Sequence, residues 1–431
     1  MTLEIVDLRG GGAQTRPAPV RIALDPDVVG SVREILGDVR ERGEEAVLDA
    51  TMRFDGADLR GRGLVVSPEE FAGADREVPA DLASAVDRMV ERLHALHERQ
   101  VPPEWWAEDD GVRFGEIVRP VAVAGCYVPG GLAAYPSTVC MTVVPAKVAG
   151  VVRVVVCTPP LPDGSVAPLV LVAARRAGAD LVVKAGGVQA IAAMAYGTAS
   201  VPAVDVIVGP GNVYVTAAKR EVAGDVGIDS LAGPSELVVV ADGSARSELV
   251  AADLLAQAEH DPLAATSLVT TDETLVAGVR AALEADVARA SRRDVIAASI
   301  GRARAVLVDD LEQAARVANE LAPEHLEIVL EDPRAFVPLV RNAGAVFLGA
   351  STTVPFGDYG VGSNHVLPTM GTARFSGGLR VTNFLKVSSV VEVAPDGARR
   401  HAREVSALAR AEGLYAHARA VELRSLGAGD A

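Results

Sequence analysis

Short β-branched runs alternate with helical segments through the middle of the chain, and this alternation constrains the possible folds more than any other feature. The first series begins after Gly150. It has strand-like runs at 151–157, 181–184 and 204–208, and helical segments at 168–177, 189–196 and 213–222. Strands that alternate with helices in this way are typical of a parallel sheet covered by helices on its faces.

A second series of the same kind follows, so the sequence predicts two α/β units. Its strand-like runs are 237–240, 267–270, 305–308, 326–330 and 345–348, and its helical segments are 247–259, 273–290, 311–321 and 336–341. Amphipathic helices at 26–52 and 79–100 precede both series, and a charged helical tail at 396–425 follows them. The predicted fold class is α/β, with two incomplete Rossmann-like parallel-sheet domains, an N-terminal helical segment and a C-terminal helical tail.

The segment from Pro120 to Ala146 contains no charged residue and is long enough to suggest a membrane span. Prolines and glycines interrupt it repeatedly, and a helix so interrupted would leave backbone groups unsatisfied in lipid. We therefore expect buried loop and short strand in a soluble protein, where the charge-free stretch forms a pocket wall.

Composition excludes several classes of protein. Apolar residues make up 49% of the 431 positions, which argues against a disordered chain. The net charge of −16 leaves no bulk attraction for nucleic acid or for anionic lipid. The chain has 3 cysteines and no CxxC pair, which suits a reducing compartment and not a disulfide framework. The first residues show no secretory signal, so we expect a cytoplasmic protein.

Two glycine-containing turns follow predicted strands of the first series. The turn Gly209–Asn212 closes a strand and opens a helix, and Lys184–Gly187 does the same before Gln189. A helix N-terminus can accept a phosphate, but Tyr214 stands where the third glycine of the dinucleotide fingerprint belongs. Alone, each turn is more often structural. Together they place two turns at the carboxyl ends of parallel strands and predict a non-standard dinucleotide site.

Two histidines lie at helix ends beside other functional side chains. Gln257 and His260 are three residues apart, so they share a helix face and can point at one zinc ion. Glu324 and His325 adjoin between a helix and a strand, where burial can separate their pKa values for acid–base catalysis. A capping or surface role for His260 and a merely polar helix end at Glu324 remain open alternatives at this point.

The remaining candidates are weaker when taken singly. Asp358 lies between glycines, where an aspartate is usually a turn residue. Glu412 and His417 lie five apart in the last helical segment, a spacing that suits a solvated surface. Neither HExxH nor a cysteine cluster is present in the sequence, so spacing alone does not establish a metal site.

Taken together, these segments resemble the histidinol dehydrogenase family, and the resemblance covers nearly the whole chain in order. The motifs are Tyr127–Gly131, Tyr135–Val139, Gly209–Asn212, Ala232–Glu236, Gln257–His260, Ala322–Glu327, Gly357–Tyr359 and Asn364–Pro368.

The resemblance implies an enzyme that oxidises L-histidinol through L-histidinal to L-histidine and reduces two NAD molecules. It implies that zinc is bound by Gln257, His260, Asp358 and His417. It implies NAD near Tyr127, Gln189 and Asn212, and an acid–base pair formed by Glu324 and His325. The substrate would contact Ser235, Gln257, His260, His325, Asp358, Glu412 and His417.

The resemblance also implies a homodimer with shared active sites, in which the tail at 381–431 packs on the partner subunit. The other predicted divisions are an N-terminal arm at 1–25, a first α/β domain at 26–126 plus 236–380, and a second at 127–235. The first domain is expected to hold the metal and the acid–base residues, and the second is expected to bind NAD.

In the implied reaction, zinc orients the substrate, His325 takes the alcohol proton and Glu324 helps water add to the aldehyde. No cysteine stands in a motif, so a covalent thiohemiacetal has no obvious nucleophile. Two rivals remain at this point. One is a zinc hydrolase in which Glu324 activates a metal-bound water, and the other is a binding protein without catalysis on the same scaffold.

Overall fold

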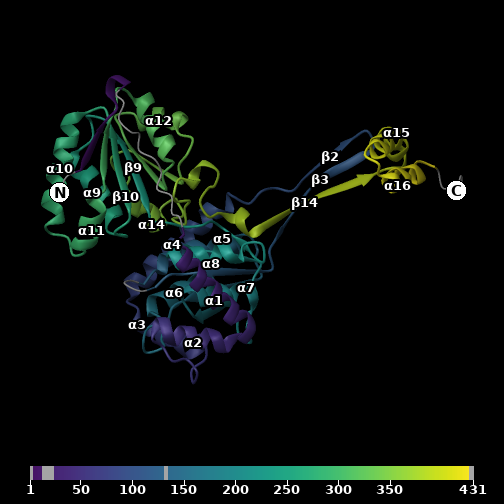
Figure 1. Ribbon diagram of the computed structural model, residues 1–431, viewed down its shortest axis with the longest axis horizontal. Helices are drawn as coiled ribbons and strands as arrows, with labels where there is room; N and C mark the ends of the chain where they lie inside the picture. The colour runs from purple at the N-terminus through teal and green to yellow at the C-terminus, as the bar shows by residue number, and fades with distance from the viewer. Residues whose placement is uncertain (1–2, 12–23, 131–133, 427–431) are drawn as a thin grey trace. The chain divides into compact units, whose positions relative to one another are not determined.

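The computed structural model describes residues 3–11, 24–130 and 134–426, and the chain divides into two units (Figure 1). The first unit comprises residues 1–100 and 122–384, and the second comprises 101–121 and 385–431. The first unit contains two parallel sheets, whereas the sheet of the second unit is antiparallel. The α/β fold class is therefore confirmed.

One sheet of the first unit has five parallel strands in the order β6-β5-β4-β7-β8. The strands are β4 Val123–Tyr127, β5 Arg153–Thr158, β6 Leu181–Lys184, β7 Val206–Val208 and β8 Gly227–Ile228. Valine-rich runs such as 154–157 are fully buried, as expected for strands covered by helices on both faces. The chain leaves β4 toward β5 and β6 and then returns to its other side at β7, which makes a topological switch point between β4 and β7.

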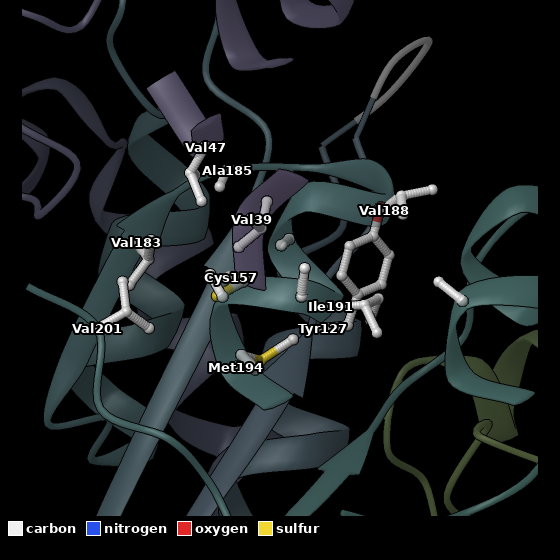
Figure 2. Close-up of a cluster of buried hydrophobic side chains, with 14 of the residues drawn as sticks. Val39, Val47, Tyr127, Cys157, Val183, Ala185, Val188, Ile191, Met194 and Val201 are labelled. Atoms are coloured by element: carbon white, nitrogen blue, oxygen red, sulfur yellow. The ribbon is translucent and has the colours of Figure 1, made fainter. Parts of the chain in front are cut away.

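Eight helices precede or alternate with these strands within the described residues. They are α1 Pro26–Arg42, α2 Glu44–Asp55, α3 Pro68–Glu77, α4 Ala80–Glu98, α5 Pro136–Val148, α6 Pro168–Ala177, α7 Gly187–Tyr196 and α8 Val213–Val222. Figure 2 shows Val39 of α1 and Val47 of α2 in one cluster with Cys157, Ile191 and Met194 from the sheet and its helices.

The packing of α1 and α2 in this cluster shows that the predicted domain boundaries need correction. Helix α1 packs on α7 and α8, and α3 and α4 pack on α6. Residues 26–98 therefore belong with the five-stranded sheet, and the prediction that joined them to 236–380 was wrong. These helices come before most of the strands of both sheets in the chain, so chain order alone does not show which sheet they cover.

The charge-free segment is also more regular than expected. It contains β4 and the helix α5, while residues 131–133 lie outside the described part. Residues 138–146 of α5 are all buried, so this helix has no polar face and no amphipathic period to reveal it. Pro145 lies in its last turn.

The second parallel sheet has six strands in the order β1-β11-β10-β9-β12-β13. The strands are β1 Glu4–Asp7, β9 Glu236–Ala241, β10 Ala265–Thr270, β11 Arg304–Leu307, β12 His325–Val329 and β13 Ala345–Leu348. The helices are α9 Ser247–Ala258, α10 Glu273–Val287, α11 Arg293–Ile300, α12 Leu311–Leu321, α13 Pro333–Phe336 and α14 Val354–Asp358. Short 3₁₀ turns occur at Arg9–Gly11, Val337–Leu339, Thr372–Arg374 and Val381–Phe384. The predicted N-terminal arm thus contributes β1 as an edge strand, while residues 1–2 and 12–23 lie outside the described part.

The second unit joins two distant parts of the chain. Strands β2 Trp105–Asp109, β3 Val112–Pro120 and β14 Leu385–Val393 form an antiparallel sheet in the order β14-β3-β2. Helices α15 Pro395–Ala411 and α16 Tyr415–Ser425 pack against each other, and Arg410 Nη2 lies 2.7 Å from Glu422 Oε1. The helices of the tail were predicted and the three strands were not. None of the helices among the described residues is long and apolar enough to cross a membrane.

Candidate active site

The first unit contains a cavity of about 880 Å³ that gathers most of the predicted site residues. It lies where the carboxyl ends of β4 and β7 are followed by Pro129 and Gly209, at the topological switch point of the five-stranded sheet. On the side of the six-stranded sheet, the cavity is lined by Ser235 before β9 and by Glu324 and His325 at the start of β12. The predicted site residues in its lining are Asn212, Ser235, His260, Glu324, His325 and Asp358.

Glu324 is held by two hydrogen bonds at the start of β12. Its Oε2 accepts a hydrogen bond from Ser235 Oγ at 2.5 Å and one from the backbone N–H of Glu236 at 3.0 Å. The residue is only 7% exposed, and burial raises the pKa of this carboxyl to about 8 against the opposing effect of these hydrogen bonds. Glu324 is therefore protonated at neutral pH and becomes a base in mild alkali.

His325 is held in one tautomer. Its Nδ1 lies 2.9 Å from the backbone carbonyl oxygen of Glu236. A carbonyl oxygen only accepts, so Nδ1 must bear the hydrogen and Nε2 has the free lone pair. Nε2 is buried and has no hydrogen-bond partner among the described residues. Burial also lowers the pKa of the ring, so His325 is a neutral base.

The contact between Glu324 and His325 is not an ion pair at neutral pH. Glu324 Oε2 lies 3.7 Å from His325 Nδ1, which satisfies the distance for a salt bridge. Both groups are buried, however, and burial raises the pKa of Glu324 and lowers that of His325. At neutral pH they are two neutral groups: His325 can accept a proton directly, and Glu324 can accept one only after it has lost its own.

The backbone around this pair explains its placement. Ala322 has a φ of +48° and ends α12 in the left-handed region, so the chain turns and β12 begins directly at His325. The neighbouring strand is tied down where Ala345 N donates to Glu324 O at 2.9 Å. A Cβ on Gly344 would lie 2.6 Å from that same oxygen, so this close approach requires glycine.

The predicted metal ligands of the first unit lie around the same cavity. Gln257 is 2% exposed near the end of α9, and its Nε2 donates to Ser235 Oγ while its Oε1 has no partner among the described residues. His260 and Asp358 line the cavity. Burial lowers the pKa of His260 and raises that of Asp358. Within the described part of the chain, no group of three or more His, Cys, Asp or Glu side chains is arranged to hold a metal.

The predicted NAD residues separate into two kinds. Asn212 lines the cavity and caps α8, since its Oδ1 accepts from Tyr214 N at 3.1 Å and Val215 N at 3.2 Å. Tyr127 and Gln189 are buried and outside the cavity lining. The Tyr127 hydroxyl accepts from Gly187 N at 3.1 Å, and Gln189 Nε2 donates to Asp55 Oδ2 at 3.2 Å. In this conformation these two side chains hold the turn after β6.

A buried ion pair that was not predicted from the sequence lies beneath the Gly209 turn. Lys219 Nζ contacts Asp229 and donates to the carbonyl oxygen of Gly209 at 3.0 Å, and Gly209 N donates to Asp229 Oδ2 at 2.7 Å. Gly209 has a φ of +117°, and a side chain there would collide with the carbonyl oxygen of Tyr127. Lys219 and Asp229 lie ten positions apart with no motif around them, so no sequence signal marked the pair.

His365 is a second residue without a predicted role. It lines the cavity, and its Nε2 has no hydrogen-bond partner among the described residues. Burial, together with the charges of the nearby His325 and His260, lowers its pKa to about 4. The only sequence signal for His365 was its position in Asn364–Pro368, one of the motifs shared with the histidinol dehydrogenase family.

Glu412 and His417 belong to the second unit. Glu412 is the C-terminal cap of α15 and His417 lies in the first turn of α16, and both side chains are exposed. The remaining predicted site residues all belong to the first unit.

Comparisons with known proteins place the chain in one family. The family model described as histidinol dehydrogenase matches residues 21–425. Histidinol dehydrogenase from Synechococcus sp. is 52% identical over 396 residues, which cover 91% of each chain. The enzyme from Moorella thermoacetica is 49% identical over 407 residues, 94% of this chain and 96% of that one.

A solved structure gives the same answer at the level of the fold. The crystal structure of histidinol dehydrogenase from Elizabethkingia anophelis is 33% identical, covers 98% of both chains and superposes with a TM-score of 0.92. A family model that spans nearly the whole chain, together with relatives of about half identity, leaves no competing assignment. The chain belongs to the histidinol dehydrogenase family of NAD-dependent oxidoreductases, which serves histidine biosynthesis.

Proposed function

We propose that the cavity oxidises L-histidinol through L-histidinal to L-histidine, with two NAD molecules reduced in turn. The observation that supports this most is the pairing of two bases of different kind at one point. His325 offers a free Nε2 because Glu236 holds its Nδ1, and Glu324 is a buried carboxyl with a raised pKa. Two successive oxidations need two proton acceptors, and this arrangement supplies them.

The two bases divide the work by their chemistry. His325 is neutral at physiological pH, so its Nε2 accepts the proton of the alcohol as hydride departs. Glu324, once ionised, accepts a proton from the water that adds to the aldehyde. NAD, when bound, accepts the hydride in each step. The three cysteines are buried, and burial raises the pKa of Cys126 and Cys140 to about 12 and that of Cys157 also, so none of them is a ready nucleophile.

Zinc is proposed to bind through Gln257, His260, Asp358 and His417. The unpaired Oε1 of Gln257, in a buried position beside Ser235, supports this set because an orphaned acceptor fits a cation. The lowered pKa of His260 keeps its imidazole neutral, as a metal ligand must be. Zinc would supply a positive centre that orients the amine and the imidazole of histidinol.

The substrate is proposed to contact Ser235, Glu412 and the metal-site residues, with His325 above the reacting carbon. NAD is proposed to bind at the switch point between β4 and β7, where Asn212 and the Gly209 turn line the cavity. Tyr127 and Gln189 would act there by holding the neighbouring turn after β6.

A homodimer with shared sites is proposed to complete the cavity. The second unit exposes an apolar face, since Trp105, Phe114, Val387, Val391 and Val393 are all at least 36% exposed. The strand register places Phe114 opposite Val391, and Trp105 packs edge-on against Phe114 with ring centres 6.1 Å apart. Such a continuous apolar face favours a protein partner, and we assign it to a second copy of this chain.

One assay tests the function. Purified protein with zinc, L-histidinol and NAD should yield two equivalents of NADH per histidinol. A zinc hydrolase would turn over without forming NADH, and a binding protein would bind histidinol without turnover. Either result would contradict the proposal.

A further inference from the structure

A second cavity of about 350 Å³ lies behind the acid–base pair, at the amino ends of the strands of the six-stranded sheet. Neighbouring residues on two chain segments face the two cavities. Ser235 and Glu324 line the active-site cavity, whereas Glu236 and Pro323 line the second one. The wall between the cavities is thus formed by the residues that hold the base Glu324.

Glu236 has an unusual environment in that wall. It is 6% exposed, and its Oε1 accepts a hydrogen bond from Met370 N at 3.1 Å. Its Oε2 has no hydrogen-bond partner among the described residues. No salt bridge to this carboxyl is found in the described part of the chain, and Arg304, which also lines the cavity, pairs with Glu4 at 3.1 Å. A buried carboxyl with one free oxygen needs a proton or water.

Both carboxyl groups hold a proton more strongly than a solvated glutamate does. Burial, together with the charge of nearby Glu324, raises the pKa of Glu236 to about 8. Burial raises the pKa of Glu324 to about 8 as well. The two residues are also adjacent, since Glu236 N donates to Glu324 Oε2 at 3.0 Å. Thr266 Oγ1 also lacks a partner and lines the second cavity, so water has two polar groups to bind there.

The reaction creates a need for such a route. Hydration and oxidation of the aldehyde leave one proton on Glu324, which must be lost before the next turnover. Glu324 is 7% exposed, and a bound substrate would cover it further. A route through the back of the site would let the proton leave while the ligands are still bound.

We propose that Glu236 relays the proton of Glu324 to water in the second cavity. At a pH where Glu236 is ionised, the Glu324 carboxyl passes its proton through water to the Glu236 carboxylate. Glu236 then protonates a water molecule in the second cavity, so that both groups return to their starting state. The inference rests on the proposed role of Glu324 as the base of the aldehyde step. It adds a proton exit that is separate from the entry of substrate.

The test compares the first turnover with steady-state turnover in Glu236→Gln. Glutamine keeps the size of the side chain and an oxygen for Met370 N, but it does not take up a proton. Stopped-flow formation of NADH from L-histidinal starts at a pH above 8, where Glu324 is already ionised. The first turnover should stay within about twofold of the unmodified enzyme, and the steady-state rate should fall by roughly tenfold or more, less than the about 10²–10⁴-fold typical of losing the base itself.

Small carboxylic acids supply the decisive readout. Formate should enter the second cavity, restore the steady-state rate of Glu236→Gln in a saturable way, and leave the unmodified enzyme unchanged. Glu236→Asp retains a carboxyl and should need less formate. The matched control is Glu327→Gln, which removes another buried glutamate that lines neither cavity. Any loss in that control should not respond to formate.

The outcomes separate the relay from the proposed function. Equal losses in the first and later turnovers of Glu236→Gln, without rescue, would mean that Glu236 only anchors Met370. An unchanged steady-state rate would also overturn the relay, and both results leave the base role of Glu324 intact. If Glu324→Gln oxidised the aldehyde at the normal rate, the base assignment itself would fail, and the relay with it.

Discussion

His325 Nδ1 lies 2.9 Å from the carbonyl oxygen of Glu236, and this single contact determines which ring nitrogen can act as a base. The contact comes from the backbone of β9, so no side-chain substitution at residue 236 removes it. The same residue donates its N–H to Glu324 at 3.0 Å. One peptide segment therefore orients both members of the acid–base pair, and the pair can be tested one residue at a time.

The division of labour between the two bases predicts different losses in the two half-reactions. His325→Ala should slow alcohol oxidation by about 10²–10⁴-fold, because the alcohol proton loses its acceptor. Glu324→Gln should slow aldehyde oxidation by more than alcohol oxidation. Separate assays with L-histidinol and L-histidinal measure this. Equal losses in both half-reactions for both variants would refute the division.

The raised pKa of Glu324 predicts the pH dependence of aldehyde oxidation. Burial raises this pKa to about 8, and a base must be ionised to act. The rate should therefore rise as the pH increases through about 8, while His325, whose pKa is lowered, stays neutral over that range. The measurement is kcat for L-histidinal between neutral and alkaline pH. The rise should disappear in Glu324→Gln, and a rate that falls over this range would contradict the assignment.

The proposed zinc site predicts a metal-dependent enzyme. Strong chelation should abolish turnover and added zinc should restore it, because the substrate loses its orienting centre. His260→Ala should lower the bound zinc measured by elemental analysis. The matched control is His94→Ala, since the side chain of His94 is 54% exposed on α4 and lies outside the cavity lining. Full activity in thoroughly metal-free protein would rule out zinc.

The ion pair beneath the Gly209 turn predicts a variant that weakens NAD use. Lys219 and Asp229 have side chains only 2% and 3% exposed. Lys219→Met would leave the aspartate buried without its partner and should cost about 3–5 kcal/mol of unfolding free energy, as is typical of breaking one side of a buried pair. Denaturant unfolding measures the loss. KM for NAD should rise as the turn loosens. An unchanged KM would mean that the ion pair stabilises the fold but does not affect NAD binding.

Much of the parallel-sheet architecture could be predicted from the sequence because buried parallel strands and amphipathic helices have distinct periods. Helix α5 escaped because it is buried on all sides. Strands β3 and β14 do place apolar residues at every second position, but Glu116 and Ser389 interrupt this alternation, and β2 has only 5 residues. Glu324 and His325 stood out as adjacent titratable residues. Glu236 did not, because it begins an otherwise apolar strand and gains its meaning only from contacts across the sheet.

The shared site predicts complementation between two inactive variants. His260 belongs to the first unit and His417 to the second, and we propose that a dimer exchanges the second units between its subunits. In a dimer of His260→Ala with His417→Ala, exchange gives one site built from two intact parts and another site with both lesions. Random mixing makes about half of the dimers mixed, so activity should return to roughly a quarter of that of the unmodified enzyme.

Without exchange, every site in every dimer keeps one lesion, so mixing should restore nothing. The two variants should therefore be co-expressed with different affinity tags and assayed before and after the doubly tagged dimers are purified. The purified mixed dimers should show about half of the activity of the unmodified enzyme, because one of their two sites is intact. Each variant alone must be dimeric and folded. In the control dimer both subunits carry His260→Ala and one of them also carries Glu404→Ala, an exposed position on α15 that is assigned no part in the site, so every site lacks His260. That control must stay inactive. Doubly tagged dimers of the two test variants that also stay inactive would show that the site is built within one subunit, and that the exposed apolar face of the second unit has another partner.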